Sequence, residues 1–256
     1  MATESAPAGW LDDYRAEGSG ESARVGIILV HGFTGSPASM RPWAHYLNDR
    51  GYTVSVPQLP GHGTHWENLN KVSWEKWPEK VISELSWIRS RCDKVFIFGL
   101  SMGGCTTLNV AEREQVDGLV LVNPMSHIPG VQIKFAPLIA LFKKGMPSVG
   151  DDIKKPGITE WGYDVLPTRG VLQLQKMLLA TRANLKKAVA PLLIFHSQDD
   201  HVLPVSNTNI IVSEIGTPID QITRVELTNS YHVATLDYDA DIIFEKSLAF
   251  VQSHSQ

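Results

Sequence analysis

The chain has 256 residues, 43% of them hydrophobic, and a net charge of −4; these values predict one globular domain with a large core. No basic block or basic–aromatic stripe occurs, which argues against nucleic acid as a partner. Residues 1–24 hold no apolar signal segment and no apolar run is long enough to span a membrane, so we expect a cytoplasmic protein. The two cysteines, Cys92 and Cys105, agree with a reducing compartment.

Continuous apolar runs of strand length alternate along the chain with segments whose apolar residues recur at helical spacing. The predicted strands are residues 25–30, 53–56, 94–98, 118–122, 192–196 and 222–227, and the predicted helices are residues 42–50, 74–91, 101–111, 169–187 and 242–251. Such alternation predicts an α/β fold with a parallel, doubly wound sheet. Residues 1–23, rich in Ala, Gly, Ser and Glu, are expected to form a loose arm.

The most informative motif is Gly99-Leu100-Ser101-Met102-Gly103, which lies between the predicted strand 94–98 and the helix after it. The pattern G-x-S-x-G in a strand–turn–helix setting is typical of a nucleophile elbow, which exposes a serine hydroxyl above the sheet. The flanking glycines are needed because such a tight turn leaves no room for a Cβ beside the serine. Ser101 is therefore the predicted nucleophile.

One connection is much longer than the others. About 65 residues lie between Met125 and Pro191, and they include the apolar stretch 135–142, a loop rich in Gly and Pro, and the helix 169–187. We expect a single domain with a core of about 24–125 and 188–254 and a small inserted cap of about 126–187. The cap is expected to cover the edge of the sheet at which Ser101 lies.

The acid that would orient the base is expected in a loop after a later strand, because chains with this elbow carry serine, acid and histidine in that order. The loop 197–200 offers two adjacent carboxylates, Asp199 and Asp200. We favour Asp200, because it is followed by His201-Val202-Leu203-Pro204, as the acid usually is in such hydrolases; Asp199 stays the alternative. The loop after strand 118–122 reads Asn123-Pro124-Met125-Ser126 and offers no carboxylate.

The predicted base is His232, the only histidine between the last predicted strand and the closing helix. A carboxylate on its Nδ1 would leave Nε2 free to take the serine proton. A tetrahedral intermediate also needs two backbone N–H donors for its oxyanion. Met102, next to the nucleophile, is expected to supply one and Phe33, in the loop after strand 25–30, the other.

Two histidine patterns carry less weight. His232 and Asp237 match the H-x4-D pattern of glycerolipid acyltransferases, which we interpret as coincidence because His232 already has a part in the serine–acid–histidine set. His62 and His65 are interpreted as part of a turn at the rim of the site, since no cysteine or carboxylate cluster at metal spacing accompanies them. No G-x-G-x-x-G follows a strand, so neither a metal nor a cofactor is expected.

Five blocks together resemble the small bacterial monoacylglycerol lipases and their carboxylesterase relatives, from about residue 24 onward. The resemblance implies the α/β-hydrolase fold with a small cap, a triad of Ser101, Asp200 and His232, and oxyanion donors at Phe33 and Met102. It also implies an apolar acyl tunnel and a cap glutamate that contacts the glycerol head group. The blocks are His31–Pro37, Gly61–His65, Gly99–Gly104, Asp200–Pro204 and Asn229–Asp237.

Glu160, in Thr159–Tyr163, is the residue that matches the cap glutamate, and the alternative is a solvated surface carboxylate. The resemblance implies cofactor-free hydrolysis of carboxylic esters through an acyl-enzyme on Ser101, with long-chain monoacylglycerol as the first substrate. A carboxylesterase of shorter esters, or a thioesterase or acyltransferase with the same triad, are the alternatives. The expected partner is a small acyl ester, and transient contact of the cap with a lipid surface is a further hypothesis; the oligomeric state is not predicted.

Overall fold

The computed structural model describes residues 5–128, 136–148 and 150–255, and these contain one seven-stranded sheet. Only the first strand, at one edge, is antiparallel to its neighbour, and all the other neighbours are parallel. In spatial order the strands are β1 (Tyr14–Ala16), β3 (Thr53–Val56), β2 (Val25–Val30), β4 (Lys94–Leu100), β5 (Gly118–Val122), β8 (Leu192–Ser197) and β9 (Ile222–Leu227). The α/β class and the mostly parallel sheet are thus confirmed.

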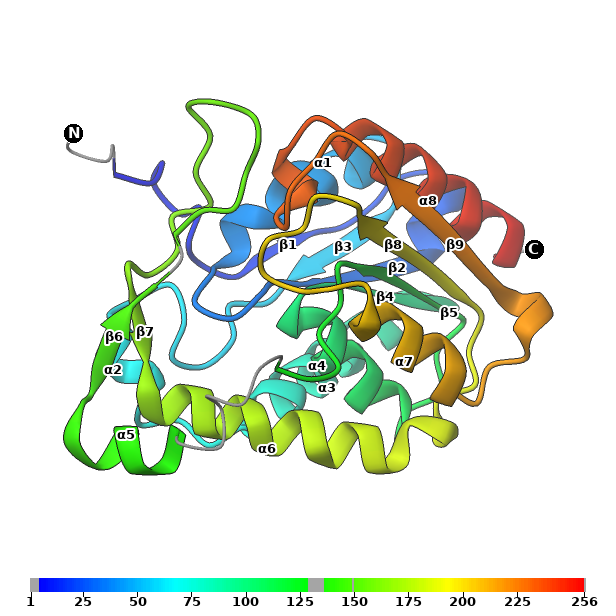
Figure 1. Cartoon of the computed structure of the whole chain (residues 1–256). Coiled ribbons are helices and arrows are strands. Elements are labelled where there is room, and N and C mark those ends of the chain that lie inside the picture. The colour runs from blue at the N-terminus through cyan, green and yellow to red at the C-terminus, as the bar shows by residue number, and fades with distance from the viewer. Residues whose placement is uncertain (1–4, 129–135, 149, 256) are drawn as a thin grey trace.

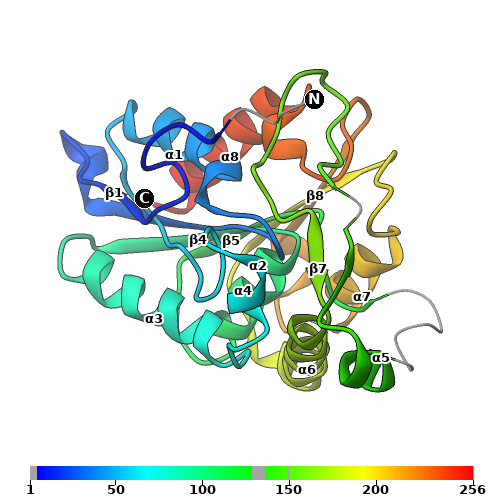
Figure 2. The same ribbon diagram turned by 90° about the vertical axis from the view of Figure 1, so that its left-hand side faces the viewer.

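Helices cover both faces of this sheet (Figures 1 and 2). The core cluster on one face includes side chains of α1 and α8, and the cluster on the other includes side chains of α3, α4 and α7, together with α6, which packs on α4. Two layers of helices around a parallel sheet explain why the central strands are apolar on both sides. The helices are α1 (Arg41–Asn48), α2 (Trp66–Leu69), α3 (Lys76–Arg89), α4 (Met102–Ala111), α5 (Ala136–Phe142), α6 (Thr168–Asn184), α7 (Ser206–Glu214) and α8 (Ala240–His254).

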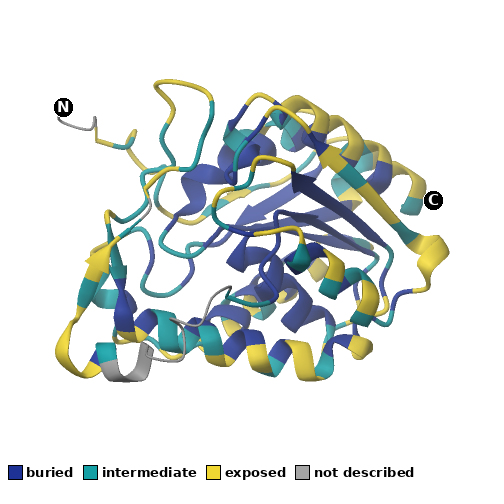
Figure 3. Cartoon of the chain, viewed as in Figure 1, coloured by how far each residue is buried: buried dark blue, intermediate teal, exposed yellow. Residues whose placement is uncertain are grey.

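The strand β2 illustrates how the core is built. Ile27 and Leu29 belong to the cluster beneath α1 and α8, whereas Ile28 and Val30 belong to the cluster beneath α3 and α4. All four side chains are fully buried, and the central strands in Figure 3 are buried along their length. Alternate side chains of a strand point to opposite faces, so each central strand contributes to both clusters.

The register of the central strands brings three loops to one edge of the sheet. Val30 lies opposite Gly99, and Leu100 lies opposite Val122. The loops that follow β2, β4 and β5 therefore leave the sheet side by side. Carboxyl ends of parallel strands are where ligands bind in open α/β sheets.

The expected loose arm is wrong for residues 14–16, which form β1 and pair with β3. The Tyr14 ring stacks on His45 with a centroid separation of 4.9 Å, and the Arg41 guanidinium lies over the Tyr14 ring, 4.7 Å from its centroid. A three-residue edge strand is too short to show a period, so its sequence gives no signal. The helix α7, likewise not predicted, has only Asn207, Thr208 and Ile211 buried.

The connection between β5 and β8 contains α5, a two-stranded antiparallel hairpin of β6 (Gly145–Pro147) and β7 (Val165–Pro167), and the long helix α6. Of the predicted apolar stretch 135–142, Phe135 and the side chains of residues 136–138 lie outside the described residues. We call this connection the β5–β8 segment. None of the helices that the structure describes combines the length and apolar character that a membrane span needs.

Candidate active site

Ser101 stands on the turn between β4 and α4, with a backbone φ of +55°. Few residues other than glycine adopt this conformation, which is held here by two backbone hydrogen bonds: the Ser101 N–H donates to Val122 (3.0 Å) and the Met125 N–H donates to the Ser101 carbonyl (3.0 Å). A Cβ on Gly103 would lie 2.0 Å from the Val30 carbonyl oxygen. Gly103, two residues after the serine, is therefore required by the close packing of α4 on β2.

Three side chains from three loops form one hydrogen-bonded chain. The Oγ of Ser101 lies 2.8 Å from Nε2 of His232, and Nδ1 of His232 lies 2.8 Å from Oδ2 of Asp200. A carboxylate can only accept from Nδ1–H, so Nε2 is left as the acceptor for the serine hydroxyl. The arrangement can remove the proton from Ser101 and hold the resulting imidazolium beside a negative charge.

Of the two adjacent aspartates, Asp200 and not Asp199 reaches His232. The Asp200 side chain is 1% exposed, and its Oδ1 accepts the N–H groups of Val202 (2.8 Å) and Leu203 (2.7 Å). The Asp199 side chain is 54% exposed and faces Lys154, whose Nζ lies 3.5 Å away. The backbone bonds to Oδ1 orient Asp200 so that Oδ2 is free for the histidine.

The loop after β2 lies directly against the serine. A Cβ on Gly32 would lie 3.3 Å from the Cβ of Ser101, and Phe33 lines the same cavity as Ser101 and His232. Buried His31 holds this loop: its Nδ1–H donates to the Gly32 carbonyl (2.9 Å), and its Nε2 accepts the Leu59 N–H (3.2 Å). Burial lowers the pKa of His31 to about 4, so the imidazole is neutral near pH 7.

Met102 is the first residue of α4, and its side chain is fully buried in the core. The first N–H groups of a helix have no partner inside the helix. Phe33, in the loop after β2, and Met102, at the start of α4, thus both lie next to Ser101. In the turn 61–65, the His62 ring is buried against the rings of Phe33 and Trp77, whereas the His65 side chain is exposed.

Two cavities share part of their lining, and Ser101 lies in the wall of one of them. One, of about 210 Å³, is largely apolar and contains Ser101 and His232 in its wall. The other, of about 250 Å³, is polar and shares Thr34 and Glu160 with the first. A ligand with an apolar chain and a polar head matches this pair of cavities. The apolar side chains of the first are Phe33, Met125, Ile128, Pro147, Leu166, Val171, Leu174, Val202 and Val233.

Glu160 is partly buried between the two cavities. Burial raises the pKa of its carboxyl to about 7, and the nearby charge of Asp151 adds to this effect while His232 opposes it. The carboxyl is close to the loop after β2, since a Cβ on Gly35 would lie 3.0 Å from its Oε2. Near neutral pH it can therefore act as hydrogen-bond donor or acceptor toward a ligand.

Asn123, after β5, is part of the site. From the sequence, its loop was noted only because it offers no carboxylate. Its Nδ2 donates to the His232 carbonyl (2.8 Å) and to Ser197 Oγ (2.9 Å), and its Oδ1 accepts the Ser197 N–H (2.7 Å). Its φ of +43° is another left-handed conformation. A turn-forming asparagine at a strand end is the one signal that could have pointed to it.

No group of three or more histidine, cysteine or acidic side chains is placed to bind a metal ion within residues 5–128, 136–148 and 150–255. The geometry thus consists of a serine, a buried base and acid, and an adjoining cavity. A model of the alpha/beta hydrolase family matches residues 27–243. The chain belongs to the alpha/beta hydrolase family.

Several members of the family are similar to this chain along most of their length. A thermostable monoacylglycerol lipase from Bacillus sp. (strain H-257) is 42% identical over 236 residues, covering 92% of this chain and 93% of the relative. A carboxylesterase from Bacillus subtilis (strain 168) is 26% identical over 227 residues, covering 88% and 92%. The resemblance drawn from the five sequence blocks is therefore confirmed.

Solved structures agree with this placement in the alpha/beta hydrolase family. One, from a description of the metagenome-derived lipolytic enzymes LipS and LipT, has a TM-score of 0.90 and 34% identity and covers 96% of this chain and 98% of its own. The monoacylglycerol lipase of Paleococcus ferrophilus has a TM-score of 0.78, with coverage of 95% and 99%, but 18% identity, so it supports the fold alone.

Proposed function

We propose that the protein is a serine ester hydrolase that cleaves monoacylglycerols to fatty acid and glycerol. The observation that carries the proposal is the hydrogen-bonded chain Ser101–His232–Asp200 in the wall of an apolar cavity that adjoins a polar one. The similarity to a monoacylglycerol lipase at 42% identity supports the same substrate class.

The geometry supports acyl transfer in two steps. Ser101 Oγ attacks the ester carbonyl carbon while His232 Nε2 takes its proton, and Asp200 stabilises the imidazolium. The N–H groups of Phe33 and Met102 would donate to the oxyanion, and the proton returns from Nε2 to the departing glycerol oxygen. Water, deprotonated by His232, then attacks the acyl-enzyme, and the fatty acid leaves as Ser101 regains its proton.

We place the acyl chain in the apolar cavity and the glycerol in the polar one. Leu166, Val171 and Leu174 contribute to the apolar wall and come from β7 and α6 in the β5–β8 segment. We propose on this basis that the segment acts as the cap, near the expected boundaries 126–187. Burying the chain removes its apolar surface from water, worth about 25 cal/mol per Å².

Changing Glu160 to glutamine should lower kcat/KM for a monoacylglycerol about 10- to 100-fold, because the ionised carboxylate makes the stronger hydrogen bonds to glycerol hydroxyls. An aryl ester of the same acyl length lacks those hydroxyls and serves as the control. The pKa of Glu160 is about 7. In the native protein, kcat/KM for the monoacylglycerol divided by kcat/KM for the aryl ester should therefore rise as the pH increases through 7. In the variant this ratio should stay flat. Equal losses on both esters would remove Glu160 from head-group recognition.

A chain-length series tests the proposed substrate class. Initial rates are measured on monoacylglycerols and on simple esters from short to long acyl chains, together with acyl-CoA thioesters. We expect the highest kcat/KM on monoacylglycerols. A steep fall beyond short chains would favour the carboxylesterase alternative, and equal rates on acyl-CoA would favour a thioesterase or acyltransferase.

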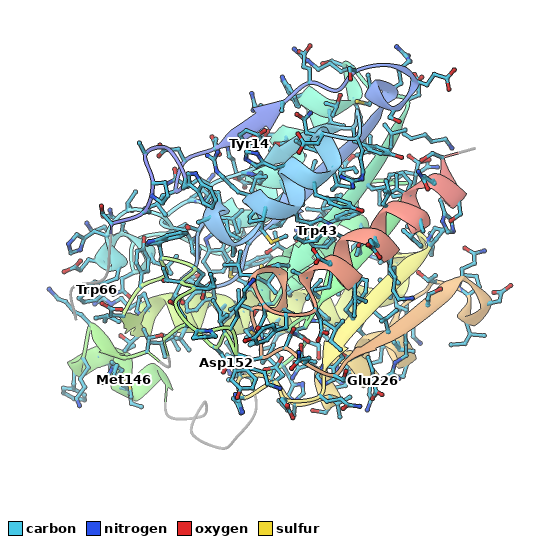
Figure 4. The ribbon with its side chains drawn as sticks, turned by 90° about the horizontal axis from the view of Figure 1, so that it is seen from above. Tyr14, Trp43, Trp66, Met146, Asp152 and Glu226 are labelled. Carbon is cyan, nitrogen blue, oxygen red and sulfur yellow. The ribbon has the colours of Figure 1, made fainter. Side chains whose placement is uncertain are left out.

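We also propose that the protein contacts lipid surfaces through the end of α5. Leu141 and Phe142 are 75% and 81% exposed, and the exposed Lys143 and Lys144 follow them. Met146, on the adjoining β6, lies at the edge of the molecule in Figure 4. Apolar side chains next to lysines match an anionic lipid surface.

The double change Leu141→Asp and Phe142→Asp should reduce co-sedimentation with phosphatidylglycerol-containing vesicles about tenfold or more, because it removes apolar contact and adds negative charge. Activity on a water-soluble aryl ester should not change. Ile219→Asp is the matched control, since Ile219 is similarly exposed but lies before β9. Unchanged sedimentation of the double variant would exclude this contact.

The cysteines support a cytoplasmic location, which we propose for this protein. Cys92 and Cys105 are both buried and unpaired. Burial raises the pKa of both thiols, that of Cys105 to about 12, so they stay protonated and unreactive. Two inert thiols without a disulfide are typical of a reducing compartment. Cell fractionation followed by immunodetection of the chain checks this location.

A further inference from the structure

Two carboxylates outside the serine–histidine–acid chain bind the backbone of the loop that carries His232. The first is Asp152, from the β5–β8 segment. Its Oδ2 accepts the His232 N–H (3.0 Å) and the His201 N–H (3.2 Å), and its Oδ1 lies 2.8 Å from His201 Nδ1. Its own carbonyl accepts the Val233 N–H (3.0 Å). Asp152 thus touches both the loop that holds the acid and the loop that holds the base.

The second is Asp237, the residue that completes the H-x4-D pattern after His232. Its side chain accepts four backbone N–H groups, and the residue is 3% exposed. Oδ2 accepts from Lys154 (2.7 Å) and Tyr231 (2.9 Å), and Oδ1 accepts from Lys155 (3.0 Å) and Tyr238 (2.8 Å). The structure therefore explains the pattern without any acyltransferase role: Asp237 joins the β5–β8 segment to the residue before His232.

These contacts fasten residues 152–155, which we call the strap, across residues 231–233. Figure 4 shows Asp152 beside the loop that leads into α8. On its other side the His232 carbonyl is held by Asn123, so both backbone polar groups of His232 are bound by side chains from other loops. Charged acceptors make stronger bonds to N–H groups than neutral ones, so the strap is firmly attached.

The position of His232 matters because its Nε2 must stay within hydrogen-bond reach of Ser101 while Nδ1 stays on Asp200. A displacement of about 1 Å can cost about a hundredfold in rate. The Oγ of Ser230, two residues before His232, accepts the N–H of Asp239 (2.8 Å), which restrains the start of the loop. The strap restrains residues 231–233, which include His232 itself.

We propose that Asp152 and Asp237 are positioning residues for His232, and that the strap keeps the base in reach of Ser101. The base is then aligned only while this part of the β5–β8 segment is in place over the loop. The proposal rests on the proposed function, because it assigns the two carboxylates to the same serine chemistry. It predicts an effect on kcat rather than on substrate binding.

The test compares variants at the two positions on a soluble aryl acetate. Asp152→Ala removes both side-chain acceptor oxygens but leaves the backbone carbonyl, and it should lower kcat about 10- to 100-fold while KM changes less than about threefold. Asp152→Asn keeps one oxygen for the His232 N–H and should restore most of kcat. Asp237→Asn, in contrast, should itself lower kcat. Each Asp237 oxygen accepts two N–H groups, so the NH₂ of an asparagine would face two donors. Asp241→Asn, an exposed carboxylate on α8, is the matched control and should keep the native kcat.

A readout without substrate separates this proposal from the proposed function. In proton NMR of the substrate-free protein, the low-field signal of the His232 Nδ1–H that is bonded to Asp200 should broaden or vanish in Asp152→Ala and Asp237→Asn and persist in Asp152→Asn and Asp241→Asn. Thermal unfolding identifies any variant that does not fold. If Asp152→Ala does not fold, kcat and the NMR signal are compared between Asp152→Asn and Asp237→Asn instead. A persistent signal with native kcat in folded Asp152→Ala or Asp237→Asn would overturn the proposal, whichever ester the native protein prefers.

Discussion

Ser101→Ala is expected to lower kcat on every ester about a millionfold, the size of loss found when the serine of a triad is removed elsewhere. The physical reason is that Ser101 Oγ is the atom at 2.8 Å from His232 Nε2 and lies in the wall of the apolar cavity. Without it no acyl-enzyme forms, and only the cavity and the oxyanion donors remain to assist water.

The measurement is the initial rate on a monoacylglycerol and on an aryl acetate, with the thermal unfolding midpoint as a check of the fold. Ser83→Ala is the matched control, because Ser83 is exposed on α3 and should leave both rates at the native value. A Ser101→Ala protein that keeps more than about one thousandth of the native kcat would contradict the assignment of the nucleophile.

Asp200→Asn should cost about ten-thousandfold in kcat, because an amide beside Nδ1 favours the tautomer in which Nε2 carries the proton and cannot accept one from serine. The 2.8 Å contact between Asp200 Oδ2 and His232 Nδ1 is the basis of this expectation. Since Asn is close to Asp in size, the bonds from Val202 and Leu203 to the remaining oxygen can persist. The fold should therefore survive the change.

Asp199→Asn is the control that the sequence itself provides, one residue away. Its carboxylate is exposed and faces Lys154, so kcat should change by less than about twofold. Rates of both variants on the same ester decide between the two aspartates. If Asp199→Asn were the damaging change, the acid would have been assigned to the wrong residue.

The sequence alone could predict the central sheet and the residues that meet at its edge. The central strands are apolar runs that end in loops. Ser101 comes directly after β4 and Asp200 three residues after β8, whereas His232 follows the largely exposed edge strand β9. Parallel strands bring these loops together, so chain order is enough to group the three residues. Their motifs are local, and local patterns are what a single sequence displays.

The residues that hold those three in place could not be predicted in the same way. Three side chains bind backbone groups of the loop that carries His232. Two of them, Asn123 and Asp152, lie far from this loop in the sequence, and the third is Asp237. A carboxylate that accepts backbone N–H bonds has no preferred spacing and looks like any polar loop residue. Edge strand β1 and the hairpin β6–β7 were missed for a related reason, since strands of three residues show no period.

The most direct test of the central claim is to stop turnover of a monoacylglycerol with acid and measure the mass of the protein. Our account predicts a population heavier by one acyl group, with the addition on the peptide that contains Ser101, and no such population in Ser101→Ala. Hydrolysis of the monoacylglycerol without an acylated Ser101 under conditions in which deacylation is slow, or no hydrolysis at all, would contradict it.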